Sequence, residues 1–290
     1  MLNIGWFSTG RDEAARQLLQ AVQESIATSD IAGKISFVFS NREPGESKES
    51  DSFFELVHSY GIPLICFSHR KFKLSLLRGA CPERDSSVAV PSLCSGLRLT
   101  PQNDKKRRAR NDTSLTEAGR NWRLEYDREV NRRIEQFAPD LCVLAGYMLI
   151  IGEELCRKYN MINLHPAPPG GPVGSWQEVI WQLIEDKAEQ AGAMMHLVTP
   201  ELDRGPVISY CLFSINHEPF DRYWQKGDKD TLFRLIRQHE LAREFPLIIS
   251  TLKALSQGSI SIRDGKVVDA QERSIDGYDL SSKINKLIAT

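Results

Sequence analysis

The chain has 290 residues, of which 41% are hydrophobic and 26% charged, and its formal net charge is −1. These values are ordinary for a globular protein with one large domain, or one domain with additions. The balanced charge gives no reason to expect a nucleic-acid or membrane partner. We see no signal-peptide pattern, and no apolar run reaches the about 20 residues that span a bilayer, so we expect a cytoplasmic location.

The cysteines do not suggest a metal centre. Six are present, and none forms a Cys-x-x-Cys pair. Zinc sites use ligands at paired spacing. We therefore expect reduced thiols and no metal site.

The first part of the chain alternates between two hydrophobic periods. Strand-like segments are expected at 2–7, 35–40 and 64–67, and helices at 12–27 and 52–60. Strands that alternate with helices at this spacing are typical of βαβ units with a parallel sheet. Right-handed crossovers then follow.

The alternation stops at about Arg78 and resumes after Asn121. The intervening segment is rich in Pro, Ser, Asp and Arg and contains the basic run from Lys105 to Arg110. A charge run is usually a solvated loop, and a nucleic-acid patch is the less favoured alternative. We predict an insertion over about 78–121.

The second part resumes the alternation. Helices are expected at 123–137, 153–158, 175–185 and 229–257, and strands at 141–144, 161–164, 193–198 and 207–215. Pro246 should kink or split the last helix, because proline lacks an N–H and crowds the preceding turn. Arg263-Asp264-Gly265 predicts a hairpin between strands at 259–262 and 266–269. We expect a catalytic domain over 1–270 and a surface tail over 271–290.

Candidate functional residues lie at a predicted strand end, in Asn163-Leu164-His165-Pro166. Asn163 and His165 alternate along the strand, so their side chains point the same way, and ligands of open α/β sheets bind beyond the carboxyl ends of strands. An amide and an imidazole, with the carboxylate of Asp203, can polarise a carbonyl and move a proton, as acyl transfer requires. A lone histidine is more often structural, so from the residues alone both roles for His165 stay open.

Three motifs in chain order resemble those of the folate-dependent formyltransferases, closest to the phosphoribosylglycinamide formyltransferases of purine synthesis. The motifs run from Ala138 to Met148, from Asn163 to Pro166, and from Glu201 to Ile208. The resemblance is loose over 3–68 and close over 122–269. It implies an α/β fold with a Rossmann-like, mostly parallel sheet flanked by helices, and a C-terminal β-hairpin.

The resemblance also implies a reaction, in which a formyl group moves from the co-substrate 10-formyltetrahydrofolate to a primary amine without a metal. Asn163 would stabilise the oxyanion, His165 would assist as an acid or electrostatic partner, and Asp203 would orient His165 and relay the proton. His196 matches a family histidine near the site, and a core-facing role for it is equally favoured. The pterin would contact Met148, Leu149, Ile150, Ile151, Thr199, Pro200, Glu201 and Leu202.

The segment that would bind the formyl acceptor departs from the family pattern. The family loop Gly-x-Gly-Ser-Asn, which holds a phosphate at a helix N-terminus, is replaced by the segment from Gly10 to Ala14, which carries two carboxylates and one arginine. The carboxylates suit a helix start but repel a phosphate. We expect glycinamide ribonucleotide or a related amine, such as an amino sugar, to be the acceptor. The acceptor-binding candidates are Gly10, Arg11, Asp12, Leu164, Pro166 and Glu240.

Two alternatives stay open. A formyltetrahydrofolate hydrolase would use water as the acceptor; such enzymes usually carry an N-terminal regulatory domain, and this chain begins with the strand expected to open the catalytic domain. A non-catalytic folate-binding relative would not need Asn163, His165 and Asp203 together. We expect folate and a small amine as ligands, no nucleic-acid or membrane partner, and we leave a homodimer open.

Overall fold

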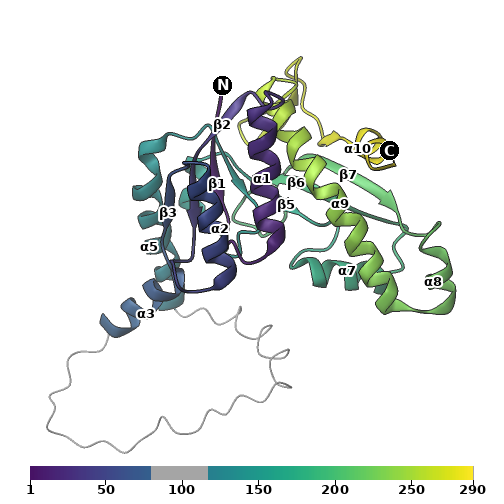
Figure 1. Cartoon of the computed structure of the whole chain (residues 1–290), viewed down its shortest axis with the longest axis horizontal. Coiled ribbons are helices and arrows are strands. Elements are labelled where there is room, and N and C mark those ends of the chain that lie inside the picture. The colour runs from purple at the N-terminus through teal and green to yellow at the C-terminus, as the bar shows by residue number, and fades with distance from the viewer. Residues whose placement is uncertain (80–116, 290) are drawn as a thin grey trace, which may run out of the picture.

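The computed structural model describes residues 1–79 and 117–289. An eight-stranded sheet with helices on both faces forms its centre (Figure 1). The strand order is β10-β7-β6-β5-β4-β1-β2-β3, and β6 alone runs against the other seven. The strands of this sheet are β1 (Leu2–Phe7), β2 (Gly33–Ser40), β3 (Leu64–Cys66), β4 (Leu141–Leu144), β5 (Met161–His165), β6 (Gln190–Leu197), β7 (Val207–Ser214) and β10 (Tyr278–Asp279). The predicted Rossmann-like, mostly parallel sheet is confirmed.

The helices largely follow the predicted segments. They are α1 (Glu13–Ala27), α2 (Lys48–Ser59), α3 (His69–Gly79), α5 (Glu117–Ile134), α6 (Glu153–Lys158), α7 (Trp176–Glu185), α8 (Asp221–Lys226), α9 (Lys229–Ser256) and α10 (Ser281–Ala289), with a 3₁₀ turn η2 (Glu135–Phe137). Helix α2 begins earlier than expected, because its first turn is polar; the carboxylates of Glu49 and Asp51 suit a helix N-terminus. In the parts of the chain that the structure describes, no helix is long and apolar enough to cross a membrane.

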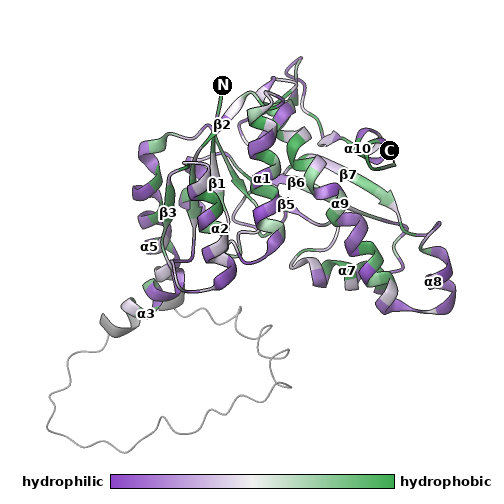
Figure 2. Cartoon of the chain, viewed as in Figure 1, coloured by the Kyte–Doolittle hydropathy of each residue, from purple (hydrophilic) through white to green (hydrophobic). Residues whose placement is uncertain are grey.

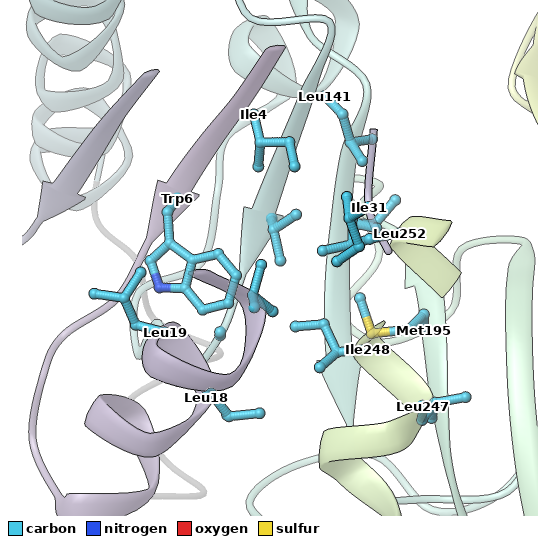
Figure 3. Close-up of a cluster of buried hydrophobic side chains, with 14 of the residues drawn as sticks. Ile4, Trp6, Leu18, Leu19, Ile31, Leu141, Met195, Leu247, Ile248 and Leu252 are labelled. Atoms are coloured by element: carbon cyan, nitrogen blue, oxygen red, sulfur yellow. The ribbon is translucent and has the colours of Figure 1, made fainter. Parts of the chain in front are cut away.

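Each face of the sheet is covered by its own hydrophobic core, because successive side chains of a strand point to opposite faces. Trp6 of β1 packs with α1, α2 and α9, and its neighbour Phe7 packs with α5 on the other face. Figure 3 shows Trp6 beside Leu18 and Leu19 of α1 in the first of these cores. In Figure 2 the central strands are largely green, and the helices that cover them carry both green and purple turns, as amphipathic helices do.

Helix α9 runs through Pro246 without a break. The expected split is therefore wrong. Proline removes one hydrogen bond and crowds one turn, and the residues that follow it compensate by burial. Leu247, Ile248 and Leu252 are each 0% exposed and pack against the sheet and α1 (Figure 3).

The predicted C-terminal hairpin is present as β8 (Ile260–Arg263) and β9 (Lys266–Asp269). The turn residues Asp264 and Gly265 both have positive φ, as a type I′ turn requires.

The expected surface tail after Ala270 is exposed over most of residues 271–277, but the residues that follow pack on the fold. Strand β10 joins the main sheet beside β7, and α10 packs against β7 and α9. Leu280 and Ile284 are buried, and the Asn285 side chain donates to the Leu212 carbonyl at 2.9 Å.

The predicted insertion at 78–121, with its basic run, falls largely outside the described residues. Its first and last residues lie in α3 and α5. Its role remains a prediction from the sequence.

Candidate active site

A cavity of about 420 Å³ opens at the carboxyl ends of β4 and β5, beside the start of α1. Its wall combines residues from these strand ends with residues of α1, α7 and α9 and of the loop after β6. Strand ends of this kind are where open α/β sheets bind ligands.

Thr9 connects the loop after β1 to the loop after β4 by two hydrogen bonds, and both loops contribute residues to the cavity wall. The Thr9 hydroxyl accepts the N–H of Met148 at 3.0 Å, and the Thr9 N–H donates to the Gly146 carbonyl at 3.2 Å. Gly10 follows with φ of 61°, and a Cβ there would lie 2.7 Å from the Phe53 ring, so a side chain is excluded. The loop after β1 and the loop after β4 therefore form one backbone unit.

His165 lies at the end of β5, 3% exposed. Its Nε2 is 3.0 Å from the Pro172 carbonyl, which can only accept, so this nitrogen carries a proton and donates. Its Nδ1 faces the Asp203 carboxylate at 3.7 Å. Burial lowers the pKa of His165, against the opposing effects of Asp203 and the Pro172 carbonyl. The ring is therefore neutral at neutral pH.

Asp203 lies opposite His165 in the loop before β7. It has φ of 53°, an uncommon conformation that aspartate tolerates better than most residues. The Gly174 N–H donates to its carboxylate at 3.2 Å. Burial alone would raise the pKa of Asp203, but the His196 ring, the His165 ring and the Gly174 N–H together hold it below its usual value. The carboxylate is therefore ionised.

His196 connects the other two groups. It pairs across the strands with Asn163, and its Nδ1 donates to the Leu197 carbonyl at 3.0 Å. When the ring is neutral, its Nε2 then accepts from the Asn163 amide at 3.2 Å, and it lies 3.5 Å from Asp203. Because it lines the cavity and contacts both groups, His196 is not a purely core-facing histidine.

The approach of the Asp203 loop to β6 depends on Gly205. A Cβ on this glycine would lie 1.8 Å from the Leu197 carbonyl oxygen, so no other residue fits. The Leu197 N–H donates to the Pro206 carbonyl at 2.8 Å in the same crossing. This local packing requires glycine at position 205 and positions Asp203 over β6.

The structure places most residues of the expected pterin site in the cavity wall. Met148, Leu149, Ile150, Thr199 and Leu202 line it, and Met148 and Leu202 are each 49% exposed. Exposed apolar side chains at a cavity mouth suit a flat aromatic ligand.

Three expected members of the pterin site lie elsewhere. Ile151 is 4% exposed and packs in the core under α5 and α6, because its side chain faces away from the cavity. Pro200 and Glu201 are exposed at the surface and do not line the cavity.

The expected acceptor residues divide similarly. Arg11, Asp12, Leu164 and Pro166 line the cavity, whereas Gly10 and Glu240 do not. Glu240 is 0% exposed, inside the fold behind the cavity wall. On α9, it is Arg237 and Glu244 that line the cavity.

Arg237 and Glu244 are charged wall residues that sequence reasoning missed, and Trp176 and Glu178 of α7 are further ones. Arg237 donates to Glu244 at 2.6 Å and stacks over the Trp176 ring of α7 at 4.6 Å. A signal was present in the sequence, because residues 237, 240 and 244 are charged and share one face of a helix that is otherwise apolar on that side.

No group of three or more His, Cys, Asp or Glu side chains that could hold a metal ion occurs within residues 1–79 and 117–289. In the same ranges Cys66, Cys142, Cys156 and Cys211 are unpaired. Cys81 and Cys94 lie outside the described residues.

Curated proteins resemble part of this chain in sequence. A phosphoribosylglycinamide formyltransferase of Escherichia coli (strain K12) is 39% identical over 88 residues, 30% of this chain and 41% of that protein. One from Saccharomyces cerevisiae is 28% identical over 144 residues, 47% of this chain and 62% of that protein. A formyltetrahydrofolate deformylase of Haemophilus influenzae is 29% identical over 97 residues, 33% of this chain and 34% of that protein. The chain thus spans less than two thirds of the length of each.

Solved structures share the fold over more of the chain. A phosphoribosylglycinamide formyltransferase from Coxiella burnetii has a TM-score of 0.63 at 19% identity, covering 96% of this chain and 98% of that one. A formyltetrahydrofolate deformylase from Pseudomonas syringae has a TM-score of 0.54 at 19% identity, covering 92% of this chain and 65% of that one. The model of the formyl transferase family matches residues 14–219. The chain therefore belongs to the formyl transferase family.

Proposed function

We propose that this protein transfers a formyl group from 10-formyltetrahydrofolate to a primary amine. The observation that carries the proposal is the meeting of Asn163, His165 and Asp203 in one wall of a cavity. An amide donor, a neutral imidazole and an ionised carboxylate supply what acyl transfer to an amine needs.

The chemistry balances with these three groups. The amine nitrogen forms a bond to the formyl carbon, and the carbonyl oxygen becomes an oxyanion that the Asn163 amide stabilises. The bond from the formyl carbon to N10 of the folate then breaks. The Asp203 carboxylate takes the proton that leaves the amine and passes it to N10, and the unprotonated Nδ1 of His165, which faces Asp203, shares that proton during the relay. The products are the N-formyl amine and tetrahydrofolate.

The apolar mouth of the cavity is the proposed place of the folate. Met148 and Leu202 would pack against its ring system, with Leu149, Ile150 and Thr199 beside them. The opposite end, beside α1 and α9, is the proposed place of the amine. This division lets the formyl group sit between the two ligands, next to Asn163.

Water is the competing acceptor. The likeness to the Haemophilus influenzae deformylase favours this second function, in which the same three residues would release formate. The two activities differ in their product. An N-formyl amine that forms in proportion to added amine supports transfer, and formate release without any amine supports hydrolysis.

The test is turnover of 10-formyltetrahydrofolate with glycinamide ribonucleotide and amino sugars, in wild type and two variants. His165→Ala and Asp203→Asn should each lower kcat by about 10²- to 10⁴-fold, the usual contribution of a positioned proton-transfer group, while folate binding is largely kept. His217→Ala, at an exposed histidine far from the cavity wall, is the matched control. Loss of folate binding in step with turnover would indicate a structural role for the pair.

A further inference from the structure

We propose that the acceptor is a primary amine without a phosphate group, whose remaining polar groups are hydrogen-bond donors such as hydroxyls or a second ammonium. This inference rests on the proposed function and narrows the class of its acceptor. It comes from the charged groups at the α1 and α9 end of the cavity.

The N-terminus of α1 is already capped by the chain itself. The Asp12 carboxylate accepts the Ala15 N–H at 3.0 Å and lies 3.3 Å from the Arg11 guanidinium. A helix N-terminus binds phosphate through backbone N–H groups and its partial positive charge. Here a carboxylate of the protein takes that position, and the nearest arginine is paired with it.

The second arginine of the cavity wall is paired as well. Arg237 donates to Glu244 at 2.6 Å, and its flat group lies over Trp176 at 4.6 Å. Its side chain is 20% exposed and that of Glu244 is 7% exposed. A phosphate that approached this guanidinium would come to lie beside the Glu244 carboxylate, which is well shielded from solvent and already neutralises the arginine.

Glu240 places a second carboxyl group behind Arg237. It is 0% exposed, its two oxygens have no hydrogen-bond partner, and its Oε2 is 3.8 Å from Arg237. Burial, and then the neighbouring Glu244, raise the pKa of Glu240 well above its usual value. A ligand N–H or O–H that donated to Glu244 would free Arg237 to donate to the unpartnered oxygens of Glu240. A hydrogen-bond donor on the ligand would therefore leave both carboxyl groups with a partner.

The charged residues of the cavity wall also favour an acceptor without a phosphate group. Within residues 1–79 and 117–289, the arginines that line the cavity are Arg11 and Arg237. The carboxylates that line it are those of Asp12, Glu178, Asp203 and Glu244. An excess of carboxylates attracts a cation or a neutral donor and repels the two negative charges of a phosphate monoester.

The test compares ligands that differ by one phosphate. Binding of glycinamide ribonucleotide and of glycinamide riboside is measured by calorimetry on the whole protein saturated with tetrahydrofolate, and the pair glucosamine 6-phosphate and glucosamine is measured alongside. The phosphate-free member of at least one pair should bind at least about tenfold more tightly, because it avoids the repulsion of the acceptor-end carboxylates.

Two variants test the assignment to Asp12. Asp12→Ser keeps a good helix cap but removes the charge, and should move the preference at least about tenfold toward the phosphorylated member. Glu13→Gln removes a charge from the same helical turn but outside the cavity wall, and should change the preference by less than about threefold.

Equal or tighter binding of the phosphorylated members to the wild type overturns the inference, and so does the absence of binding by both members of both pairs. The products of 10-formyltetrahydrofolate turnover are identified in a separate experiment. A preference for the phosphate-free member together with formate as the sole product would refute amine formylation and leave the binding preference standing.

Discussion

At the scale of single residues, two backbone carbonyls determine where the protons of the site lie. Pro172 accepts from Nε2 of His165, and Leu197 accepts from Nδ1 of His196. The opposite nitrogens then face Asp203 and Asn163. The Asn163 amide thus has one N–H directed to His196, and a second N–H is left for a ligand oxygen. His196 is a positioning residue for Asn163.

The first residue-scale prediction concerns His196. His196→Gln keeps an acceptor near the position of Nε2, whereas His196→Ala removes it. We expect kcat to fall about 10- to 100-fold in the alanine variant, with recovery of most of the loss in the glutamine variant and little change in KM for the folate. Steady-state kinetics of the two variants separates the change in kcat from the change in KM. Equal losses in both variants would show that the imidazole acts otherwise than through the Asn163 amide.

The sequence predicted some site residues and missed others for a physical reason. Asn163 and His165 are two residues apart on one strand, so period-two alternation alone places them together. Arg237 and Glu244 meet the site only through the packing of α9 on α1, α7 and β6. The same helix carries Glu240, and its sequence does not reveal which of its charged residues reaches the cavity.

At the scale of elements, α6 depends on a side chain from α5. Gly152, the residue before α6, has no capping side chain, and its N–H donates at 2.6 Å to the buried carboxylate of Asp127. A Cβ at Gly152 would lie 2.1 Å from that carboxylate oxygen, so glycine is required. Burial raises the pKa of Asp127 to about 7, assisted by Glu154 and opposed by the Gly152 N–H.

This raised pKa predicts a pH-dependent stability. The folded carboxyl keeps its proton up to about pH 7, whereas the unfolded one loses it near its ordinary pKa of 3.8. Its contribution to stability is therefore full below pH 4 and is lost as the pH rises toward 7. Asp127→Asn removes this loss while it keeps an acceptor for Gly152.

We expect Asp127→Asn to raise the free energy of unfolding at pH 8 by about 1–3 kcal/mol and to change it by less than about 1 kcal/mol at pH 4. Urea titrations at the two pH values measure both numbers. A destabilised variant at pH 8 would mean that the ionised carboxylate is required as the cap.

Elements were predictable where local rules decide them. The bounds of the β8–β9 hairpin follow from its turn residues Asp264 and Gly265. Helix α9 was not predicted as continuous, because the cost of Pro246 is local and the burial of Leu247 and Ile248 that offsets it is tertiary.

At the scale of the whole molecule, the sheet is completed by the last residues of the described chain. Strand β10 contributes two residues, too few for a periodic signal, and it pairs with β7 far away in the sequence. Helix α10 offers one buried apolar position, Ile284. Such short elements are stabilised by the surface they cover, which explains why the sequence suggested a tail.

Because α10 packs on the sheet through Ile284, which is 1% exposed, we expect truncation of this side chain to destabilise the fold. Ile284→Ala should lower the free energy of unfolding by about 2–4 kcal/mol, the usual cost of a large buried side chain. Lys286→Ala, at an exposed position of the same helix, should cost less than about 0.5 kcal/mol. Denaturant unfolding of both proteins measures the difference, and similar small costs would mean that α10 does not contribute to the fold.

Because Asn163 pairs with His196 across the strands, the geometry of the candidate site depends on whether the length of β6 changes by an odd or an even number of residues. Removing or adding one residue in β6 ahead of His196 would turn the imidazole to the opposite face of the sheet, whereas a change of two would return it. The loop between α7 and β6 carries none of the site residues. Single-residue insertions or deletions compatible with activity should therefore fall in that loop, and they should avoid both the strand and the loop after it, which holds Asp203 and Gly205.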